Sequence, residues 1–346
     1  MDLLNEIVKE IGSDYAKIAS EETDTETYID TGSYVFNGLV SGSLSDGGVS
    51  NNRITAIAGE TSTGKTFFSL AVVKNFLDNN PKGYVLYFDT ESAVNKDMLE
   101  DRKIDTKRVA HIEVVTIEEF RSKALKAIDI YLNKPIEERT PCLFVLDSLG
   151  MLSTEKEIRD ALDDKQVRDM TKSQLVKGAF RMLTLKLGQA NVPLIVTNHT
   201  YDVIGAYVPT KEMGGGSGLK YAASTIIYLS KSKEKDGKEV IGNIIKAKTA
   251  KSRLSKENKQ VEIRLFYDER GLDKYYGLLD LAEKYDIIKK VGNRYDINGK
   301  KVYAKEVYKN PELYFDQFIM QALEECAMKE FSYGEVRSND SKESDS

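Results

Sequence analysis

The sequence has few cysteines and no long hydrophobic segment. Its two cysteines, Cys142 and Cys326, lie far apart in the chain, so we expect reduced thiols in a cytoplasmic protein and neither a disulfide nor a metal site. No apolar run approaches the roughly 20 residues that a membrane-spanning helix requires. The first residues lack the basic and then apolar order of a signal peptide. We therefore expect no membrane partner.

The sequence also lacks a strong charge of either sign. A net charge of −5 over 346 residues argues against a general attraction to polyanions, although an acidic protein can still carry a local basic surface. Hydrophobic residues make up 41% of the chain, which is enough to bury a core. The length predicts one large domain or two.

The most informative segment is GETSTGKT at residues 59–66, which fits the phosphate-binding P-loop pattern G-x-x-x-x-G-K-[ST]. Residues 53–58 before it read as a short buried strand, and residues 67–73 after it begin a buried helix. Glycines let the backbone approach a phosphate chain closely, and backbone N–H groups and the helix N-terminus add partial positive charge. The alternative is an ordinary glycine-rich turn.

We therefore predict a nucleotide and Mg²⁺ site at this loop. Lys65 would reach the β- and γ-phosphates, and the Thr66 hydroxyl would bind Mg²⁺. The residues predicted to contact the nucleotide here are Gly59, Glu60, Thr61, Ser62, Thr63, Gly64, Lys65, Thr66 and Phe67.

Two further buried strands are expected to end in acids beside this loop. Residues 85–88 form a continuous apolar run that leads to Glu91, and residues 143–146 form another that leads to Asp147. Doubly wound parallel sheets bind ligands at the carboxyl ends of their strands. Glu91 is thus a candidate general base that orients water on a γ-phosphate, and Asp147 fits the Walker B acid beside Mg²⁺. The alternative for each is a plain acid at a strand end.

A third apolar run, residues 194–197, leads to His199 and then to an irregular stretch, residues 200–218. His199 could sense the γ-phosphate, or it could be a structural histidine. A long irregular stretch inside a compact domain is usually functional or disordered. Its glycine run, residues 214–218, lets backbone N–H groups approach phosphates closely, with Lys211 beside it. The alternative is a plain flexible loop.

Cations are dense between Lys246 and Lys259. Such a run is normally a solvated face, and otherwise it serves a phosphate or a nucleic acid. Further along, Asn298-Gly299 signals the turn of a hairpin. Residues 311–329 are expected to form a last helix.

Taken together, these motifs resemble those of the RecA-type strand-exchange recombinases, and most closely the UvsX recombinases of tailed phages. The likeness covers roughly residues 28–330. The segments that carry it are IDTGS at 29–33, GETSTGKT at 59–66, FDTE at 88–91, LDSLG at 146–150, TNHTY at 197–201, MGGGSGLKY at 213–221, KSR at 251–253 and YGLLD at 276–280.

The resemblance implies the ATP and Mg²⁺ chemistry of that family. Glu91 would activate water, and His199, where bacterial RecA has glutamine, would couple the γ-phosphate to the glycine run. Lys251 and Arg253 match cations that reach across a filament interface to the ATP of the neighbouring protomer. Met98 takes the place of an aromatic residue that stacks on adenine.

The resemblance also implies two DNA-binding loops, one near residues 157–168 and one ending near 213–221. Single-stranded DNA would bind along a helical filament and be paired with a homologous duplex, and mediator and single-strand-binding proteins would be further partners. A bacterial-type C-terminal DNA-gathering domain is expected to be absent or reduced. The residues expected to contact DNA are Arg159, Lys165, Arg168, Lys211, Gly214, Gly215, Gly216, Ser217 and Gly218.

The implied fold is α/β: a RecA-like P-loop NTPase core with a mostly parallel sheet flanked by helices, a short N-terminal arm and a small C-terminal α+β extension. The arm would pack on an adjacent protomer, because an interface that does not close builds an open helix. The expected divisions are an oligomerisation arm at 1–28, the ATPase core with its DNA-binding loops at 29–270, a C-terminal extension of the core at 271–334 and a disordered tail at 335–346.

The implied function is that of a DNA-dependent ATPase and recombinase. It would form helical filaments on single-stranded DNA and catalyse homologous pairing and strand exchange in recombination, repair and recombination-dependent replication. It would act in the cytoplasm, that of the host cell if a phage encodes it. Two alternatives are a hexameric DNA helicase of RecA fold and a non-catalytic accessory paralogue. Residues 198–221 argue against the helicase, and Glu91, Asp147, Lys251 and Arg253 argue against the paralogue.

Overall fold

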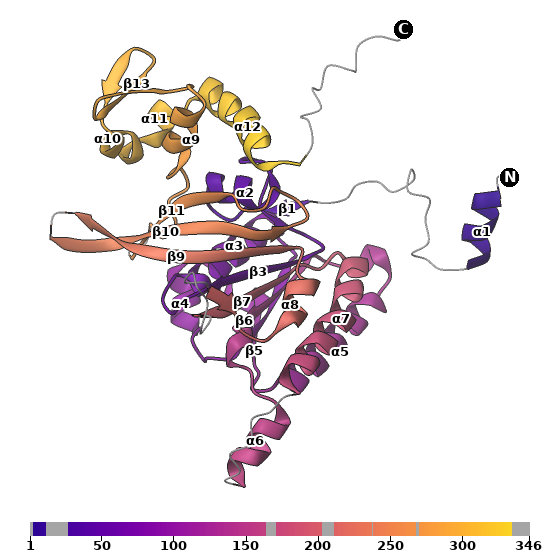
Figure 1. The fold of residues 1–346 in the computed structure, drawn as a ribbon. Coiled ribbons are helices and arrows are strands. Elements are labelled where there is room, and N and C mark those ends of the chain that lie inside the picture. Colours follow the sequence, from indigo (N-terminus) through magenta and orange to yellow (C-terminus); the bar gives the residue numbers. More distant parts are fainter. Residues whose placement is uncertain are drawn as a thin grey trace.

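The fold is built on one large β-sheet (Figure 1). The computed structural model describes residues 3–11, 27–163, 171–202, 211–236, 238–267 and 270–333. Within these residues the sheet has nine strands, in the order β11-β10-β9-β3-β7-β6-β4-β5, with β8 paired to β7. The strands are β1 (Tyr28–Ile29), β2 (Val49–Ser50), β3 (Ile54–Gly59), β4 (Tyr84–Asp89), β5 (Val109–Glu113), β6 (Cys142–Asp147), β7 (Leu194–Asp202), β8 (Lys211–Met213), β9 (Thr225–Asp236), β10 (Glu239–Ser252), β11 (Gln260–Phe266), β12 (Lys289–Val291), β13 (Arg294–Ile297) and β14 (Lys300–Val302).

Most of the large sheet is parallel. β3 pairs in parallel with β7 and β9, β6 pairs in parallel with β7 and β4, and β4 does so with β5. Only the β9–β10–β11 end and the short β8 add antiparallel pairs among the described strands of this sheet. Every residue of β3 and β6 is buried, as expected for strands covered on both faces. The predicted α/β class with a mostly parallel sheet is therefore confirmed.

Helices cover both faces of the sheet, because side chains along each strand alternate between two hydrophobic clusters. Ile57 lies in the cluster formed with α2 and α3, whereas Ala56 and Ala58 lie in the cluster formed with α5, α7 and α8. In the second cluster the rings of Phe88 and Phe120 meet edge to face at 5.2 Å. The helices are α1 (Leu3–Ile11), α2 (Tyr34–Ser41), α3 (Lys65–Asn79), α4 (Lys96–Asp101), α5 (Ile117–Leu132), α6 (Glu155–Leu162), α7 (Lys172–Ala190), α8 (Ser217–Ala222), α9 (Leu278–Lys284), α10 (Ala304–Lys309), α11 (Pro311–Tyr314) and α12 (Gln317–Phe331).

The C-terminal residues form a small α+β unit, coloured orange and yellow in Figure 1. It contains the three-stranded sheet β12-β13-β14 and helices α9 to α12. Asn298 and Gly299, at the turn between β13 and β14, have φ angles of 51° and 79°, as the predicted hairpin requires. Phe331 of α12 belongs to the same hydrophobic cluster as Phe36 of α2, so this unit packs on the core.

Some elements differ in length from the sequence prediction. Although residues 231–237 are mostly polar, β9 and β10 continue almost to the tip of the hairpin that they form. Exposed lysines there hide the hydrophobic alternation by which a strand is recognised. The stretch 200–218 is not wholly irregular, because β7 and β8 pair within it and α8 begins in it. The predicted last helix, 311–329, is two helices, and the Asp316 side chain caps the second.

The predicted tail and most of the predicted N-terminal arm lie outside the described residues. The arm is represented by α1, which has no buried residue. None of the helices in the described ranges combines the length and the apolar character that crossing a membrane demands. The four divisions of the chain proposed from the sequence stay a prediction.

Glu330 of α12 connects the C-terminal unit to the core through a buried carboxylate. Its Oε1 accepts a hydrogen bond from Lys259 Nζ at 2.8 Å. Its Oε2 accepts from Tyr285 OH at 2.6 Å and lies 2.7 Å from Lys284 Nζ. Burial by itself would raise the pKa of Glu330, but the hydrogen bonds outweigh burial and lower the pKa to about 2.

We expect Glu330→Gln to lower the free energy of unfolding near neutral pH by about 1–3 kcal/mol, because charged hydrogen bonds inside the protein are lost. The pKa of Glu330 in the folded chain lies below its usual value of 4.5. The stabilisation is therefore present above that value and is lost as the pH falls toward 2. Urea unfolding of both proteins from neutral to acidic pH measures this, with the exposed Glu325→Gln as control. A stability difference that does not shrink in acid would contradict it.

Candidate functional site

The loop after β3 has the shape of a phosphate cradle. A Cβ atom added at Gly59 would lie 2.6 Å from Thr63 Oγ1 and 2.8 Å from the carbonyl oxygen of Leu229. Gly64 has a φ of +89°, a conformation that other residues rarely adopt. Helix α3 begins directly afterwards, at Lys65. Both glycines of the motif are thus required by the backbone, and a helix N-terminus faces the loop.

Lys65 lies folded against the loop that carries it. Its side chain is buried, and Nζ donates to the carbonyl oxygens of Gly59 at 3.1 Å and Glu60 at 2.9 Å. Burial lowers the pKa of Lys65, and the carboxylates of Asp147 and Glu91 act in the opposite direction. The ammonium therefore belongs to the same electrostatic cluster as both predicted acids.

Asp147 ends β6 and is held by two neighbouring strands. Tyr87 of β4 donates its hydroxyl to Asp147 Oδ2 at 2.7 Å, and Thr197 of β7 donates to Oδ1. Asp147 is 4% exposed, so these two donors supply the hydrogen bonds that a buried carboxylate needs. The oxygens of Asp147 and of Thr66, the second residue of α3, are ligands of the kind that Mg²⁺ prefers.

Glu91 follows β4 and is held by two donors on one oxygen. Ser148 Oγ donates to Glu91 Oε1 at 2.7 Å, and His199 Nε2 lies 3.1 Å from the same atom. We assign the proton to His199 Nε2, because an ionised carboxylate can only accept. Burial would raise the pKa of Glu91, but these hydrogen bonds outweigh it and the pKa is lowered. Glu91 is therefore ionised near neutral pH, as a general base must be.

A series of hydrogen bonds continues from Glu91 to the glycine run. The backbone N–H of His199 donates to Asn198 Oδ1 at 2.8 Å, and Asn198 Nδ2 donates to the carbonyl oxygen of Gly214 at 2.8 Å. The N–H of Gly214 returns to the carbonyl oxygen of His199 at 3.0 Å. The structure thus joins the predicted base, the predicted sensor and the predicted DNA segment.

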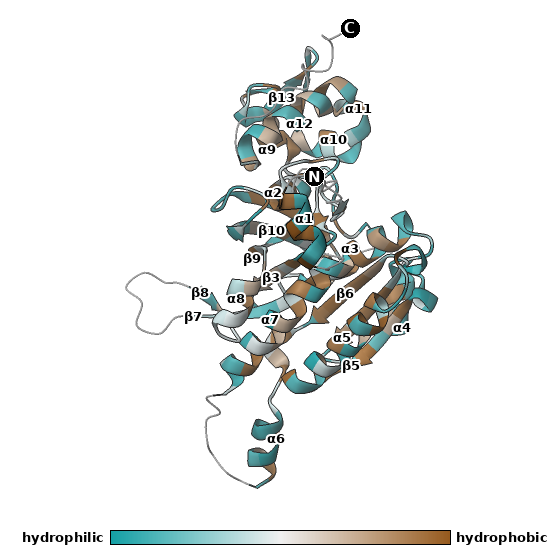
Figure 2. Cartoon of the chain, turned by 90° about the vertical axis from the view of Figure 1, so that its right-hand side faces the viewer, coloured by the Kyte–Doolittle hydropathy of each residue, from teal (hydrophilic) through white to brown (hydrophobic). Residues whose placement is uncertain are grey.

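The predicted DNA-contacting residues fall in different places. Arg159 is exposed on α6, which extends away from the sheet in Figure 1 and is mainly hydrophilic in Figure 2. Lys165 and Arg168 lie outside the described residues. Lys211 forms an ion pair with Glu60 of the P-loop and another, at 3.3 Å, with Asp202. Lys211, three residues before the glycine run, therefore contacts the P-loop.

Lys251 and Arg253 lie at the opposite edge of the sheet from the P-loop. Ser252 pairs with Thr225 at the start of β9, and β9 runs parallel to β3 toward the P-loop after Gly59. Roughly 13 Å of strand therefore separates the two edges. Lys251 Nζ donates to two carbonyl oxygens at the end of α8. A single chain does not bring these cations to its own P-loop.

Phe67 and Met98 are brought together by a residue that the sequence reasoning missed. The Arg102 guanidinium lies 4.3 Å from the centre of the Phe67 ring, and its Nη1 donates to the carbonyl oxygen of Met98 at 2.9 Å. Both predicted residues are half-buried against the first hydrophobic cluster. Arg102 directly follows α4 and is four residues after Met98, and this spacing was the available signal.

Tyr87 and Thr197 are further residues that the sequence reasoning did not identify. Each places a hydroxyl group next to buried apolar residues of its strand, and a buried hydroxyl needs a partner. That pattern was the available signal. The partner itself, Asp147, lies 60 and 50 residues away in the sequence, so the strand order was needed to find it.

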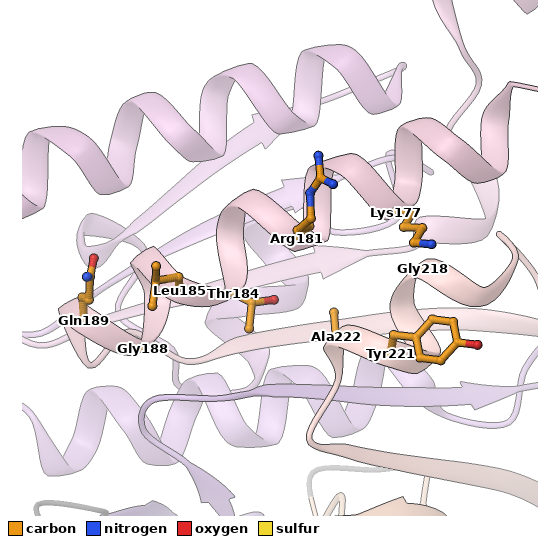
Figure 3. A pocket seen from close by; sticks show the side chains of 9 residues that line it. All are labelled: Lys177, Arg181, Thr184, Leu185, Gly188, Gln189, Gly218, Tyr221 and Ala222. Carbon is orange, nitrogen blue, oxygen red and sulfur yellow. The ribbon is translucent and has the colours of Figure 1, made fainter.

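A groove lies apart from the P-loop, between α7 and α8 (Figure 3). It has a volume of about 510 Å³, and its lining includes small residues as well as the exposed side chains of Leu185 and Tyr221. Helix α8 begins within the glycine run, and Lys251 Nζ donates to the carbonyl oxygens of Lys220 and Tyr221 near its end. The groove therefore belongs to the side of the molecule that carries Lys251. Its lining residues are Lys177, Arg181, Thr184, Leu185, Gly188, Gln189, Gly218, Tyr221 and Ala222.

Comparison with known proteins agrees with this geometry. The RecA N-terminal domain family matches residues 2–273. The recombination and repair protein of Enterobacteria phage T4 is 31% identical over 278 residues, which are 80% of this chain and 68% of that protein. Protein RecA of Streptomyces rimosus is 28% identical over 258 residues, 74% of this chain and 65% of that protein. The chain, with its P-loop, its acids at the strand ends and its glycine run, belongs to the RecA family.

Proposed function

We propose that this protein is an ATP-dependent DNA recombinase. It binds ATP and Mg²⁺ at the P-loop, assembles helical filaments on single-stranded DNA, pairs that DNA with a homologous duplex and exchanges strands. The observation that carries the proposal is the series of hydrogen bonds from Glu91 through His199 and Asn198 to Gly214, because it joins the nucleotide site to the segment proposed to bind DNA. The relatives described above are a RecA protein and a recombination and repair protein.

The residues of the nucleotide site fit a triphosphate with Mg²⁺. Bound MgATP supplies the phosphoanhydride bond that is hydrolysed. Lys65 and the N–H groups of the loop hold the phosphates, and Thr66 and Asp147 offer oxygens to the metal ion. Glu91 orients a water molecule and accepts its proton, since its lowered pKa keeps it ionised. The hydrogen bonds to Asp147 and Glu91 hold both acids in place before substrate arrives.

His199 couples the nucleotide to DNA in this proposal. It lies between Glu91 and Gly214. A γ-phosphate that competes with Glu91 for the hydrogen bond from His199 Nε2 therefore also changes the position of the glycine run. The single-stranded DNA then meets a loop whose conformation depends on ATP, which is a known form of switching.

Lys251 and Arg253 complete the nucleotide site of the adjacent protomer. They lie at the edge of the sheet opposite to their own P-loop, so an interface that stacks one edge on the other brings cations to the phosphates. Such an interface joins two different surfaces, and its repetition builds an open helix. Helix α1, which buries none of its residues, is proposed to pack on a neighbouring protomer. The filament acts on DNA in the cytoplasm.

The proposed function is tested by ATP hydrolysis with and without single-stranded DNA, followed by negative-stain microscopy of the same samples. We expect turnover that rises with DNA, and helical filaments, because the nucleotide and DNA segments share hydrogen bonds. Strand exchange between homologous substrates is then the direct assay. Closed rings would favour a hexameric helicase, and the absence of both turnover and assembly would favour an accessory paralogue.

We expect Glu91→Gln to keep ATP binding and filament assembly but to slow hydrolysis by at least about a hundredfold, because an amide cannot accept the proton. Lys65→Ala should instead abolish turnover through loss of phosphate binding. Fluorescent-nucleotide titration separates these two effects. Hydrolysis at the normal rate in the Glu91 variant would remove this residue from the reaction.

Two inactive variants should restore activity when mixed. Lys65→Ala destroys a protomer's own site but keeps its cations, whereas the double variant Lys251→Ala/Arg253→Ala keeps the P-loop and loses the cations. In a random one-to-one filament about a quarter of the interfaces join an intact P-loop to intact cations. We therefore expect turnover near that fraction of the wild-type rate from the mixture, and almost none from either variant alone. No recovery in mixed filaments would place the cations outside the neighbour's site.

A further inference from the structure

Asp89 is a buried acid that the reaction described above does not use. It is the last residue of β4 and is 2% exposed. Its Oδ1 accepts hydrogen bonds from the backbone N–H of Glu91 at 2.9 Å and of Ala93 at 3.4 Å. Its Oδ2 accepts from the N–H of Val94 at 3.1 Å. This one carboxylate thus binds the backbone of the loop that carries Glu91.

His111 completes the surroundings of Asp89. It lies on β5, the edge strand next to β4, and its Nε2 is 2.9 Å from Asp89 Oδ2. The carboxylate can only accept a hydrogen bond, so we assign the proton to His111 Nε2. The His111 side chain is 36% exposed. The imidazole therefore contacts the buried acid on one side and solvent on the other.

The charge of Asp89 depends on these donors. Burial would raise the pKa of Asp89, but the hydrogen bonds from His111 and from the backbone of Glu91, Val94 and Ala93 outweigh it, and the pKa is lowered. A buried carboxylate that loses a donor is costly unless its surroundings rearrange. The backbone of residues 91–94 is the part that could move, because the next helix, α4, begins only at Lys96.

We propose that His111 and Asp89 are a positioning pair for Glu91. His111 fixes the Asp89 carboxylate, and Asp89 fixes the loop, so that Glu91 meets Ser148 and His199 and is aimed at the attacking water. Neither member touches the nucleotide. The expected effect on kcat rests on the proposed ATPase activity. The expected effect on the backbone of residues 91–94 rests on the hydrogen bonds alone.

Two substitutions separate the donor from the bulk of the imidazole. His111→Ala removes the hydrogen bond to Asp89, whereas His111→Gln offers an amide N–H from a side chain of similar reach. We expect kcat for ATP to fall by about ten- to a hundredfold in the alanine variant, since small displacements of a catalytic group have effects of this size. The KM for ATP should stay close to wild type, because the P-loop is untouched. The glutamine variant should recover most of kcat.

Backbone exchange gives a readout that does not depend on ATP hydrolysis. Hydrogen–deuterium exchange of the amides at residues 91–94 should be about tenfold faster in His111→Ala, since their acceptor is loosened. The same amides should be protected in His111→Gln, and exchange in α3 should be unchanged in both. Glu113→Gln, an exposed change on the same strand, is the control and should alter neither exchange nor kcat.

The outcomes distinguish this inference from the proposed function. Unchanged exchange at 91–94 in His111→Ala, or loss of kcat that glutamine does not restore, overturns the positioning pair. A parallel rise in KM and fall in kcat with general loss of protection also overturns it, because His111 would then be merely structural. Faster exchange at 91–94 in a protein whose wild type does not hydrolyse ATP supports the pair and overturns the ATPase.

Discussion

Parallel pairing of β3, β7, β6 and β4 is the constraint on which the rest of the structure depends. Parallel strands end at the same edge, so residues far apart in the chain become neighbours there. The register sets Gly59 beside His199 and Asp89 beside Asp147. The P-loop, Asp147 and the residues that join Glu91 to the glycine run therefore meet at this one edge. A shift of register by one residue would turn these side chains to the other face.

This edge brings the carboxylates of Asp147 and Glu91 close to Lys65, and hydrogen-bond donors hold the acids of this edge in place. Tyr87 and Thr197 donate hydrogen bonds to Asp147, and Ser148 donates one to Glu91. His199 contacts Glu91, and His111 contacts Asp89. Low polarity strengthens each of these hydrogen bonds, and it would make any missing one costly. The acids are therefore fixed in place by the folded chain itself, which is what a site that stabilises developing charge requires.

The sequence predicted those parts of the structure that depend on local pattern. The P-loop, the buried strands that lead to Glu91, Asp147 and His199, and the hairpin at Asn298 each follow from spacing and turn chemistry. What could not be predicted depends on which strands are neighbours. The hydroxyl of Tyr87 on Asp147, and the pairing of Lys211 with Glu60, join residues 60 and 151 positions apart. Periodicity carries no information about such partners.

The P-loop lies at one edge of the sheet, and Lys251 and Arg253 lie at the opposite edge, so the protomer has a direction. In the proposed assembly every junction is made of a phosphate-binding edge and a cationic edge, so all protomers point the same way along the DNA. One terminal protomer then has a P-loop that no neighbour completes, and this protomer does not hydrolyse ATP. At the other terminal protomer, Lys251 and Arg253 meet no P-loop. The two ends of a filament thus differ chemically, growth and release need not be symmetric, and short filaments are less active per protomer than long ones.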